Sequence, residues 1–261
     1  MLPTTIDEVI AELEQILDTC ARTNNRLGYF AALYYKVTCR VREGIKNQEF
    51  EDGPRMERLD VTFANRYLQA WRTWQAGQPP TASWQLAFQA GTSRQVLVLQ
   101  HLLLGMNAHI NLDLGIAAAE VAAASGLPAT RKDFLAINGI LALLTGDVMA
   151  SLRRVSPLLS LLGLHATRYN SILIQFSLSN ARDGAWCFAE ELADQAAPTY
   201  TPVLQARDKS IAELATSLTR ATGLMRLTLW AIHVVEWRSP ARIMQVLRDE
   251  GPRAVKAASV Q

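Results

Sequence analysis

Hydrophobic residues recur at intervals of three and four along almost the whole chain, which is the spacing of one face of an α-helix. The first such set comprises Ile6, Val9, Ile10, Leu13, Ile16 and Leu17. Thr5 and Glu8 stand at the spacing of a capping box, which favours a helix start there. No stretch alternates strictly between apolar and polar residues, and no repeat of fixed period occurs. The pattern therefore predicts an all-α protein.

Breaks in this pattern divide the rest of the chain into helices of ordinary length. We expect them at about 27–46, 55–74, 83–89, 94–124, 130–152, 168–180, 185–195, 203–220 and 224–237, with a last helix beginning at Ser239-Pro240. Proline and glycine stand between several of them, as in the run Gly126-Leu127-Pro128. No linker separates two folding units. Residues 1–250 are thus expected to form a single domain of about ten helices, followed by a flexible tail at 251–261.

The helix expected at 94–124 is apolar on every side, and such a helix usually lies at the centre of a bundle. It nevertheless carries His109 and Asp113, four residues apart and therefore on one face. An unpaired polar group in an apolar interior costs roughly 2–7 kcal/mol, so we expect the two side chains to pair. This pair is the first candidate catalytic site, in which Asp113 fixes the tautomer of His109 and stabilises its protonated form.

Four further residues of the same helix are candidate binding residues. Met106 shares the side of His109, and His101 lies at the edge of that sector, two turns earlier. Asn107 and Asn111 lie roughly opposite. We expect these two amides to face a different neighbouring helix.

The helix expected at 55–74 directs a second acid inward. Its apolar stripe comprises Met56, Leu59, Phe63, Tyr67, Ala70 and Trp74. Asp60 lies near this stripe, whereas Arg58 lies away from it. Asp60 is therefore a candidate catalytic acid or base. Arg58 is a candidate binding residue, with an ordinary solvent-exposed position as the alternative.

A third candidate face lies near the C-terminus and comprises Arg226, Trp230, His233 and Trp237. Aromatic rings beside a histidine can line a pocket for a planar or cationic ligand. The alternative is that these residues pack beneath another helix.

Composition narrows the class of protein. The chain has 261 residues, of which 49% are hydrophobic and 19% charged, as in a soluble globular protein with a sizeable core. A net charge of +2 is too balanced to favour nucleic-acid binding. The cysteines, Cys20, Cys39 and Cys187, form no disulfide framework or paired zinc motif, which fits a reducing compartment. No uninterrupted apolar run reaches the roughly 18 residues of a membrane span, so we expect a cytoplasmic protein.

Two motifs together resemble a family of helical, mostly bacterial proteins catalogued as a domain of unknown function. They are Glu57-Arg58-Leu59-Asp60-Val61-x-Phe63-Ala64-Asn65-x-Tyr67-Leu68 and Gly105-Met106-Asn107-Ala108-His109-Ile110-Asn111-x-Asp113-Leu114. The resemblance covers most of the chain and implies that both motifs belong to one site-bearing fold. A weaker likeness is to zinc-dependent phospholipase C, which uses His-x-x-x-Asp pairs on helices. Only His109 and Asp113 match it, and the other zinc histidines are missing.

Three functions are compatible with these residues. In the first, His109, Asp113 and Asp60 perform metal-free acid–base chemistry, without a cofactor, on a hydrophobic small molecule in an apolar pocket. Cyclisation, isomerisation, elimination and hydrolysis all fit. In the second, the same three residues hold a catalytic metal. In the third, the chain is a non-enzymatic binding or scaffold protein whose buried polar groups fix the helix register. Inward placement of three ionisable groups favours the first.

Overall fold

The structure, a computed structural model, describes residues 1–165, 178–194 and 197–249. Its elements are α1 (Ile6–Arg22), α2 (Gly28–Lys46), α3 (Gly53–Gln75), α4 (Ala82–Ala90), α5 (Val98–Ala108), the π-helical turn η1 (His109–Asp113), α6 (Leu114–Ser125), α7 (Leu127–Val155), the 3-10 helix η2 (Leu159–His165), α9 (Leu178–Ala193), α10 (Ala197–Thr219), α11 (Leu224–Val235) and α12 (Pro240–Arg248). No strand occurs in these ranges, and the all-α fold class is confirmed. Most of the helix expected at 168–180 and the tail at 251–261 lie outside the described residues.

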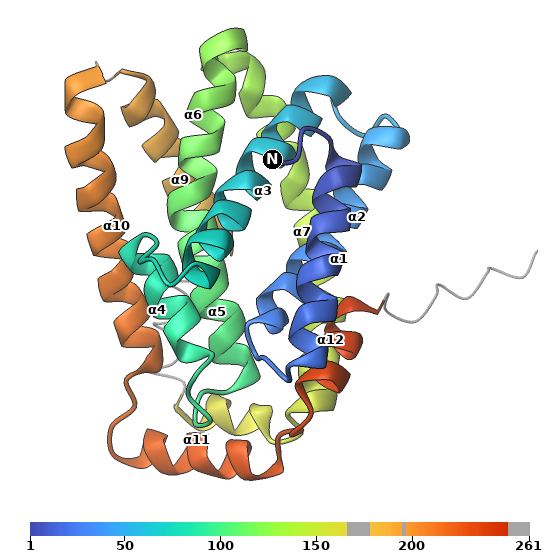
Figure 1. The fold of residues 1–261 in the computed structure, drawn as a ribbon, viewed down its shortest axis with the longest axis vertical. Coiled ribbons are helices and arrows are strands. Elements are labelled where there is room, and N and C mark those ends of the chain that lie inside the picture. Colours follow the sequence, from blue (N-terminus) through green and yellow to red (C-terminus); the bar gives the residue numbers. More distant parts are fainter. Residues whose placement is uncertain (166–177, 195–196, 250–261) are drawn as a thin grey trace, which may run out of the picture.

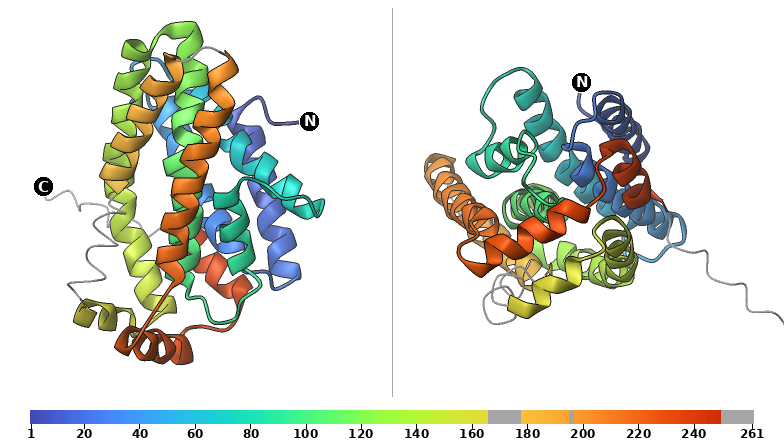
Figure 2. Two further views of the ribbon diagram at one scale, coloured as in Figure 1. Left: turned by 90° about the vertical axis from the view of Figure 1, so that its left-hand side faces the viewer. Right: turned by 90° about the horizontal axis from the view of Figure 1, so that it is seen from below.

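The column formed by α5, η1 and α6 runs through the middle of the molecule, between α10 on one side and α1 and α2 on the other (Figure 1). Seen from below, other helices surround this column (Figure 2). Its buried apolar residues include Leu102, Leu103, Leu104, Ala108, Leu112, Leu114, Ile116 and Ala117. The expected central position of this apolar helix is therefore confirmed.

The central column differs from the expected straight α-helix in two ways. It begins at Val98 instead of about 94, where the Glu236 carboxylate accepts the backbone N–H of Val98 at 3.2 Å and thereby caps the helix. It also contains a π-helical turn over His109–Asp113. Such single π turns inside α-helices are rare and frequently occur at functional sites.

The bounds of α7 also differ from the prediction, because the helix begins at Leu127 and not near Thr130. Pro128 lies in the first turn, where its missing N–H has no helical partner to lose. Gly126, with φ +79°, reverses the chain between α6 and α7, a conformation that glycine adopts without strain.

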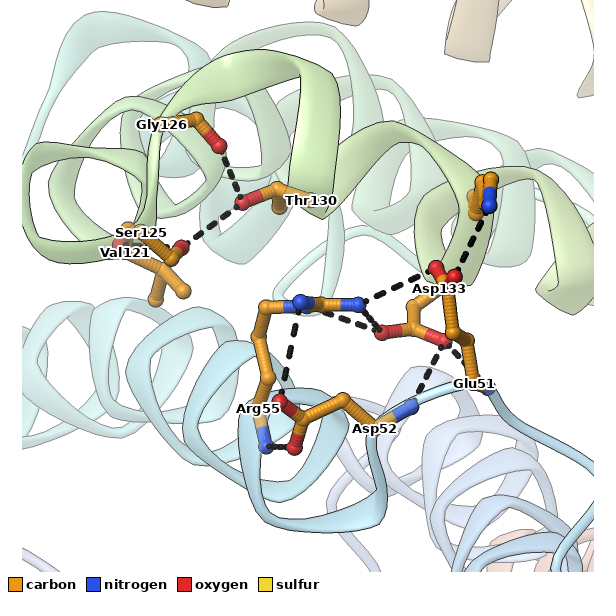
Figure 3. Close-up of polar contacts among 9 residues, drawn as sticks. Glu51, Asp52, Arg55, Val121, Ser125, Gly126, Thr130 and Asp133 are labelled. Atoms are coloured by element: carbon orange, nitrogen blue, oxygen red, sulfur yellow. Dashed lines mark hydrogen bonds and ion pairs between the residues drawn. The ribbon is translucent and has the colours of Figure 1, made fainter.

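A buried ion pair joins the start of α3 to α7 (Figure 3). Asp133 of α7 accepts hydrogen bonds from Nε of Arg55 at 2.9 Å and from its Nη2 at 2.6 Å. The backbone N–H of Glu51 also donates to Asp133, at 2.8 Å. This network of charge-assisted hydrogen bonds holds α3 and α7 in register.

In the part of the chain that the structure describes, two helical stretches are long and apolar enough to cross a membrane, Val98–Ser125 and Leu127–Val155. In the first, 78% of the apolar window is buried inside the protein, whereas in the second only 18% is buried. The core helix of a soluble protein meets the same criteria, so the expected absence of a membrane span stays a prediction.

Candidate functional site

A cavity of about 340 Å³ lies between α2, α3, α5 and α7, with η1, α6 and α9 also contributing to its wall. Most of its lining is aliphatic or aromatic. The polar side chains in the lining are Tyr34, Asp60, His109, Thr145 and Arg182. An apolar cavity of this size with few polar groups has the character of a small-molecule site.

The buried pair at the centre of the site is the one that the spacing predicted. Nδ1 of His109 lies 3.2 Å from Oδ2 of Asp113, which confirms the contact. Two further donors hold the acid: Nε1 of Trp84 at 2.8 Å and Nε of Arg66 at 3.2 Å. As a carboxylate, Asp113 accepts from all three, so the Nδ1 of His109 carries the proton.

This arrangement directs the other ring nitrogen of His109 away from Asp113. Nε2 is buried and has no hydrogen-bond partner among the described residues. The His109 ring stacks on the ring of Phe63, with centroids 3.6 Å apart and an angle of 9° between the planes. It forms a T-shaped contact with the ring of Tyr34, with centroids 4.5 Å apart. Burial lowers the pKa of His109, and Asp113 opposes this shift only in part. His109 is therefore a neutral imidazole with an unused lone pair at neutral pH.

Asp60 of α3 lines the same cavity. It forms no hydrogen bond with His109, whose Nδ1 pairs with Asp113. Its side chain is 4% exposed, and Oδ2 has no partner among the described residues. Burial, assisted by the charge of Glu57, raises the pKa of Asp60 to about 7. Near neutral pH a large share of Asp60 therefore carries its proton.

Tyr34 is a site residue that the sequence did not single out. Its hydroxyl is buried and forms no hydrogen bond of good geometry with a described residue. Burial raises the pKa of Tyr34 well above the ordinary value, with smaller contributions in the same direction from Asp60 and Asp113 and an opposing one from the nearby Thr38 side chain. Tyr34 lies in an aromatic stretch of α2 together with Tyr29 and Tyr35, and nothing in the helical spacing distinguishes it from those residues.

The candidate binding residues of the central helix separate into two groups. Met106 lines the cavity. Asn107 and Asn111 face α10, as expected, where Nδ2 of Asn107 donates to the carbonyl of Ile211 at 2.9 Å and Asn111 donates to Asn107 at 2.9 Å. These amides join two helices and do not line the cavity.

His101 and Arg58 also lie outside the cavity lining. His101 is buried against the ring of Tyr29, with centroids 5.4 Å apart, and burial lowers its pKa to about 3. Arg58 is exposed, in agreement with its alternative interpretation.

The C-terminal candidate face, Arg226, Trp230, His233 and Trp237, does not form one pocket in the structure. Trp230 is 65% exposed and borders an open surface hollow with Arg226. Trp237 instead packs against the core, with the guanidinium groups of Arg154 and Arg242 over its ring. His233 is partly buried and borders neither the hollow nor the cavity.

No group of three His, Cys, Asp or Glu side chains placed to hold a metal ion occurs in the part of the chain that the structure describes. His109, Asp113 and Asp60, the alternative metal ligands, therefore do not form such a group. Asp113 instead accepts hydrogen bonds from Arg66 and Trp84.

Residues 6–221 match a protein family described as "Family of unknown function (DUF5995)". Because the match spans most of the chain, the chain belongs to this family. No curated protein and no solved structure matches it.

Proposed function

We propose that this member of the family is an enzyme that transfers protons to and from a hydrophobic small molecule bound in the cavity. The single observation that carries the proposal is the presence of three buried polar atoms without partners in one apolar cavity: Nε2 of His109, Oδ2 of Asp60 and the hydroxyl of Tyr34. Buried polar groups in folded proteins are nearly always hydrogen-bonded. A ligand with a polar reacting group would supply the missing partners.

His109 is the proposed general base. Its neutral ring keeps a lone pair on Nε2, because the proton on Nδ1 is held by Asp113. When Nε2 takes a proton from the substrate, the Asp113 carboxylate stabilises the imidazolium that forms. Hydrogen bonds from Trp84 and Arg66 keep that carboxylate in position.

Asp60 and Tyr34 are the proposed acids. With its pKa raised to about 7, Asp60 retains a proton that it can donate where negative charge develops on the substrate. The Tyr34 hydroxyl can donate a hydrogen bond to the same oxygen or to one nearby. The aliphatic walls exclude water, which strengthens both interactions.

This arrangement suits cyclisation, isomerisation or elimination, because each of these moves a proton between substrate atoms or to a leaving group without net oxidation. No cofactor is needed for such a step. We propose further that α5–η1–α6 is a core helix and not a membrane span, in line with its 78% burial, and that the protein is cytoplasmic. Recovery of the protein in the soluble fraction after lysis would support this, whereas recovery only with detergent would contradict it.

Incubation in D₂O tests the proposed chemistry while the substrate is still unidentified. The wild type is mixed with an apolar metabolite extract of the producing cells, and mass spectrometry follows compounds that disappear or gain deuterium. We expect His109→Gln to abolish every such change. His101→Gln is the matched control, since His101 is a buried histidine of the same column outside the cavity. Equal conversion by His109→Gln would contradict the role of His109 as the base. Absence of any conversion by the wild type would contradict the proposed enzyme and leave a binding protein as the explanation of the cavity.

The pH dependence of the identified reaction gives an independent test. The base must be neutral, so activity falls at pH values below the lowered pKa of His109. The acid must be protonated, so activity also falls as pH rises through about 7, the pKa of Asp60. We expect a bell-shaped profile with a mildly acidic optimum, whose alkaline limb disappears in Asp60→Asn together with most of the rate. A rate that keeps rising above pH 8 would contradict these roles.

A further inference from the structure

Arg182 of α9 is a buried cation in the cavity wall that the proposed proton transfer does not use. The side chain is 4% exposed and lines the same cavity as His109. Its guanidinium donates from Nε to Oδ1 of Asn138 and from Nη2 to the carbonyl of Phe134. It also stacks on the Phe134 ring, with Cζ 4.3 Å from the centroid. These partners orient the group, but none of them carries a negative charge.

Comparison with Arg55 shows how unusual this environment is. Arg55 is similarly buried, at 8% exposure, and is paired with the equally buried Asp133 at 2.6 Å. For Arg182, no ion pair with an acid occurs among the described residues. The segment 166–177 contains no Asp or Glu that could supply one. The neighbouring Asp183 is exposed, and its charge offsets only part of the effect of burial on the pKa of Arg182.

The cavity therefore has an unbalanced positive charge. Burial lowers the pKa of Arg182 to about 10, so the guanidinium remains protonated at neutral pH. The acid in the same lining, Asp60, has a pKa of about 7 and is therefore only partly ionised there, and His109 is neutral. A buried charge without a counter-ion is costly, and an anion that enters the cavity would remove this cost.

The shape of the cavity indicates the rest of such a ligand. On α7 the lining runs from Ile137 to Leu152, fifteen residues further along (152 − 137), which at 1.5 Å per residue corresponds to about 22 Å. Arg182 contacts Phe134 and Asn138, so its guanidinium marks one end of this wall. Beyond it the lining of α7 is almost wholly aliphatic.

We propose that the cavity binds an elongated apolar carboxylic acid whose carboxylate pairs with Arg182 while its hydrocarbon body lies along α7. This inference rests on the proposed function only in taking the cavity as the ligand site. A guanidinium has more N–H donors than its contacts with Asn138 and Phe134 use, and its planar geometry matches a carboxylate. The substrate class of the enzyme is then a long-chain or otherwise extended carboxylic acid.

Displacement of the neutral dye Nile red by myristate and by myristyl alcohol tests the pairing, since the two probes share one hydrocarbon chain. We expect the wild type to bind myristate about tenfold or more tightly than the alcohol, the minimum effect of a charge-assisted hydrogen bond. Arg182→Gln should weaken myristate binding by the same factor and leave alcohol binding unchanged.

Arg207→Gln is the matched control. Arg207 of α10 also donates to backbone carbonyls, those of Asn111 and Gly184, and lies over an aromatic ring, that of Phe188. It does not line the cavity, so the preference for myristate should survive in this variant.

A measurement on the wild type alone decides the matter if Arg182→Gln does not fold. Myristate labelled with ¹³C at the carboxyl carbon is bound at pH 6, and its chemical shift reports ionisation. Beside Arg182 the carboxyl is ionised, whereas an apolar cavity without a usable cation would keep it protonated. A protonated bound acid, or equal affinity for acid and alcohol, overturns the inference but leaves the cavity as a ligand site. Absence of binding by both probes overturns the inference and counts against the cavity as a ligand site as well.

Discussion

Burial of Asp60 makes the stability of the protein depend on pH. The pKa of this group rises from 3.8 to about 7 on folding, so the folded state holds a proton that the unfolded chain releases. The contribution of protonated Asp60 to the free energy of unfolding is fully present below about pH 4 and is lost as pH rises to about 7. Above that pH the folded protein must hold an ionised carboxylate in an apolar cavity. At 1.36 kcal/mol per pKa unit the loss is on the order of a few kcal/mol.

Asp60→Asn isolates this effect, because asparagine cannot ionise. We expect the free energy of unfolding of the wild type, measured in urea, to decrease relative to that of Asp60→Asn between about pH 4 and pH 7. Parallel curves for the two proteins would show that Asp60 ionises as easily in the fold as in the unfolded chain.

Asp113 should be sensitive even to replacement by its amide. Its carboxylate accepts N–H groups from His109, Trp84 and Arg66, whereas an amide would present its own NH₂ group to at least one of them. We expect Asp113→Asn to remain folded but to lose about 1–3 kcal/mol of stability, together with activity. Asp18→Asn changes an exposed aspartate on α1 and should melt like the wild type. An unchanged melting temperature in Asp113→Asn would contradict the three-donor arrangement.

Spacing within one helix predicted the contact between His109 and Asp113, because both residues belong to the same turn. Spacing likewise indicated that Asp60 and Met106 face inward, and both line the cavity. The site residues contributed by other parts of the chain could not be assigned in this way. Trp84 and Arg66 approach Asp113 from sequence separations of 29 and 47 residues. Arg182 is brought into the wall by packing of α9, and no local pattern indicates such a position.

At the scale of helices, the close packing of α6 on α9 depends on a glycine. A Cβ at Gly115 would lie 2.8 Å from the carbonyl oxygen of Ala185 and 2.8 Å from the ring of Phe188. We expect Gly115→Ala to separate the two helices and to destabilise the protein by about 1–3 kcal/mol in thermal or urea unfolding.

Gly139 on α7 provides the control, because a Cβ there would meet no atom within 4 Å. In the middle of a helix, alanine is favoured over glycine by roughly 0.5–1 kcal/mol, so Gly139→Ala should be slightly stabilising. The two identical substitutions are thus expected to have opposite signs. Stabilisation by both would show that α6 and α9 are not in close contact at Gly115.

Hydrophobic periodicity located most helices to within a few residues, but α9 begins at Leu178 and α10 at Ala197, well before the expected starts at 185 and 203. Other helix starts depend on contacts that local spacing does not contain. The start of α5 at Val98 depends on Glu236, far along the chain, and the early start of α7 depends on tolerance of Pro128 in the first turn. The π-helical turn at His109–Asp113 has no counterpart in the spacing of apolar residues, since a single inserted residue leaves both flanking patterns intact.

At the scale of the whole molecule, the cavity results from the packing of several helices against one another. Its walls come from α2, α3, α5, η1, α6, α7 and α9. Its polar side chains lie on α2, α3, η1, α7 and α9. The sequence could indicate that an apolar central helix carries a polar pair. It could not indicate that surrounding helices leave a space of about 340 Å³ beside that pair.

The state of the His109 ring tests the central claim most directly, and ¹⁵N NMR of the protein labelled at histidine measures it in the absence of any substrate. We predict a neutral ring at pH 7 with its proton on Nδ1, and a change in the Nε2 signal when an apolar ligand fills the cavity. The signals of His101, outside the cavity, should not change. A doubly protonated His109 at pH 7, or an Nε2 signal that ignores a bound ligand, would contradict its role as the base.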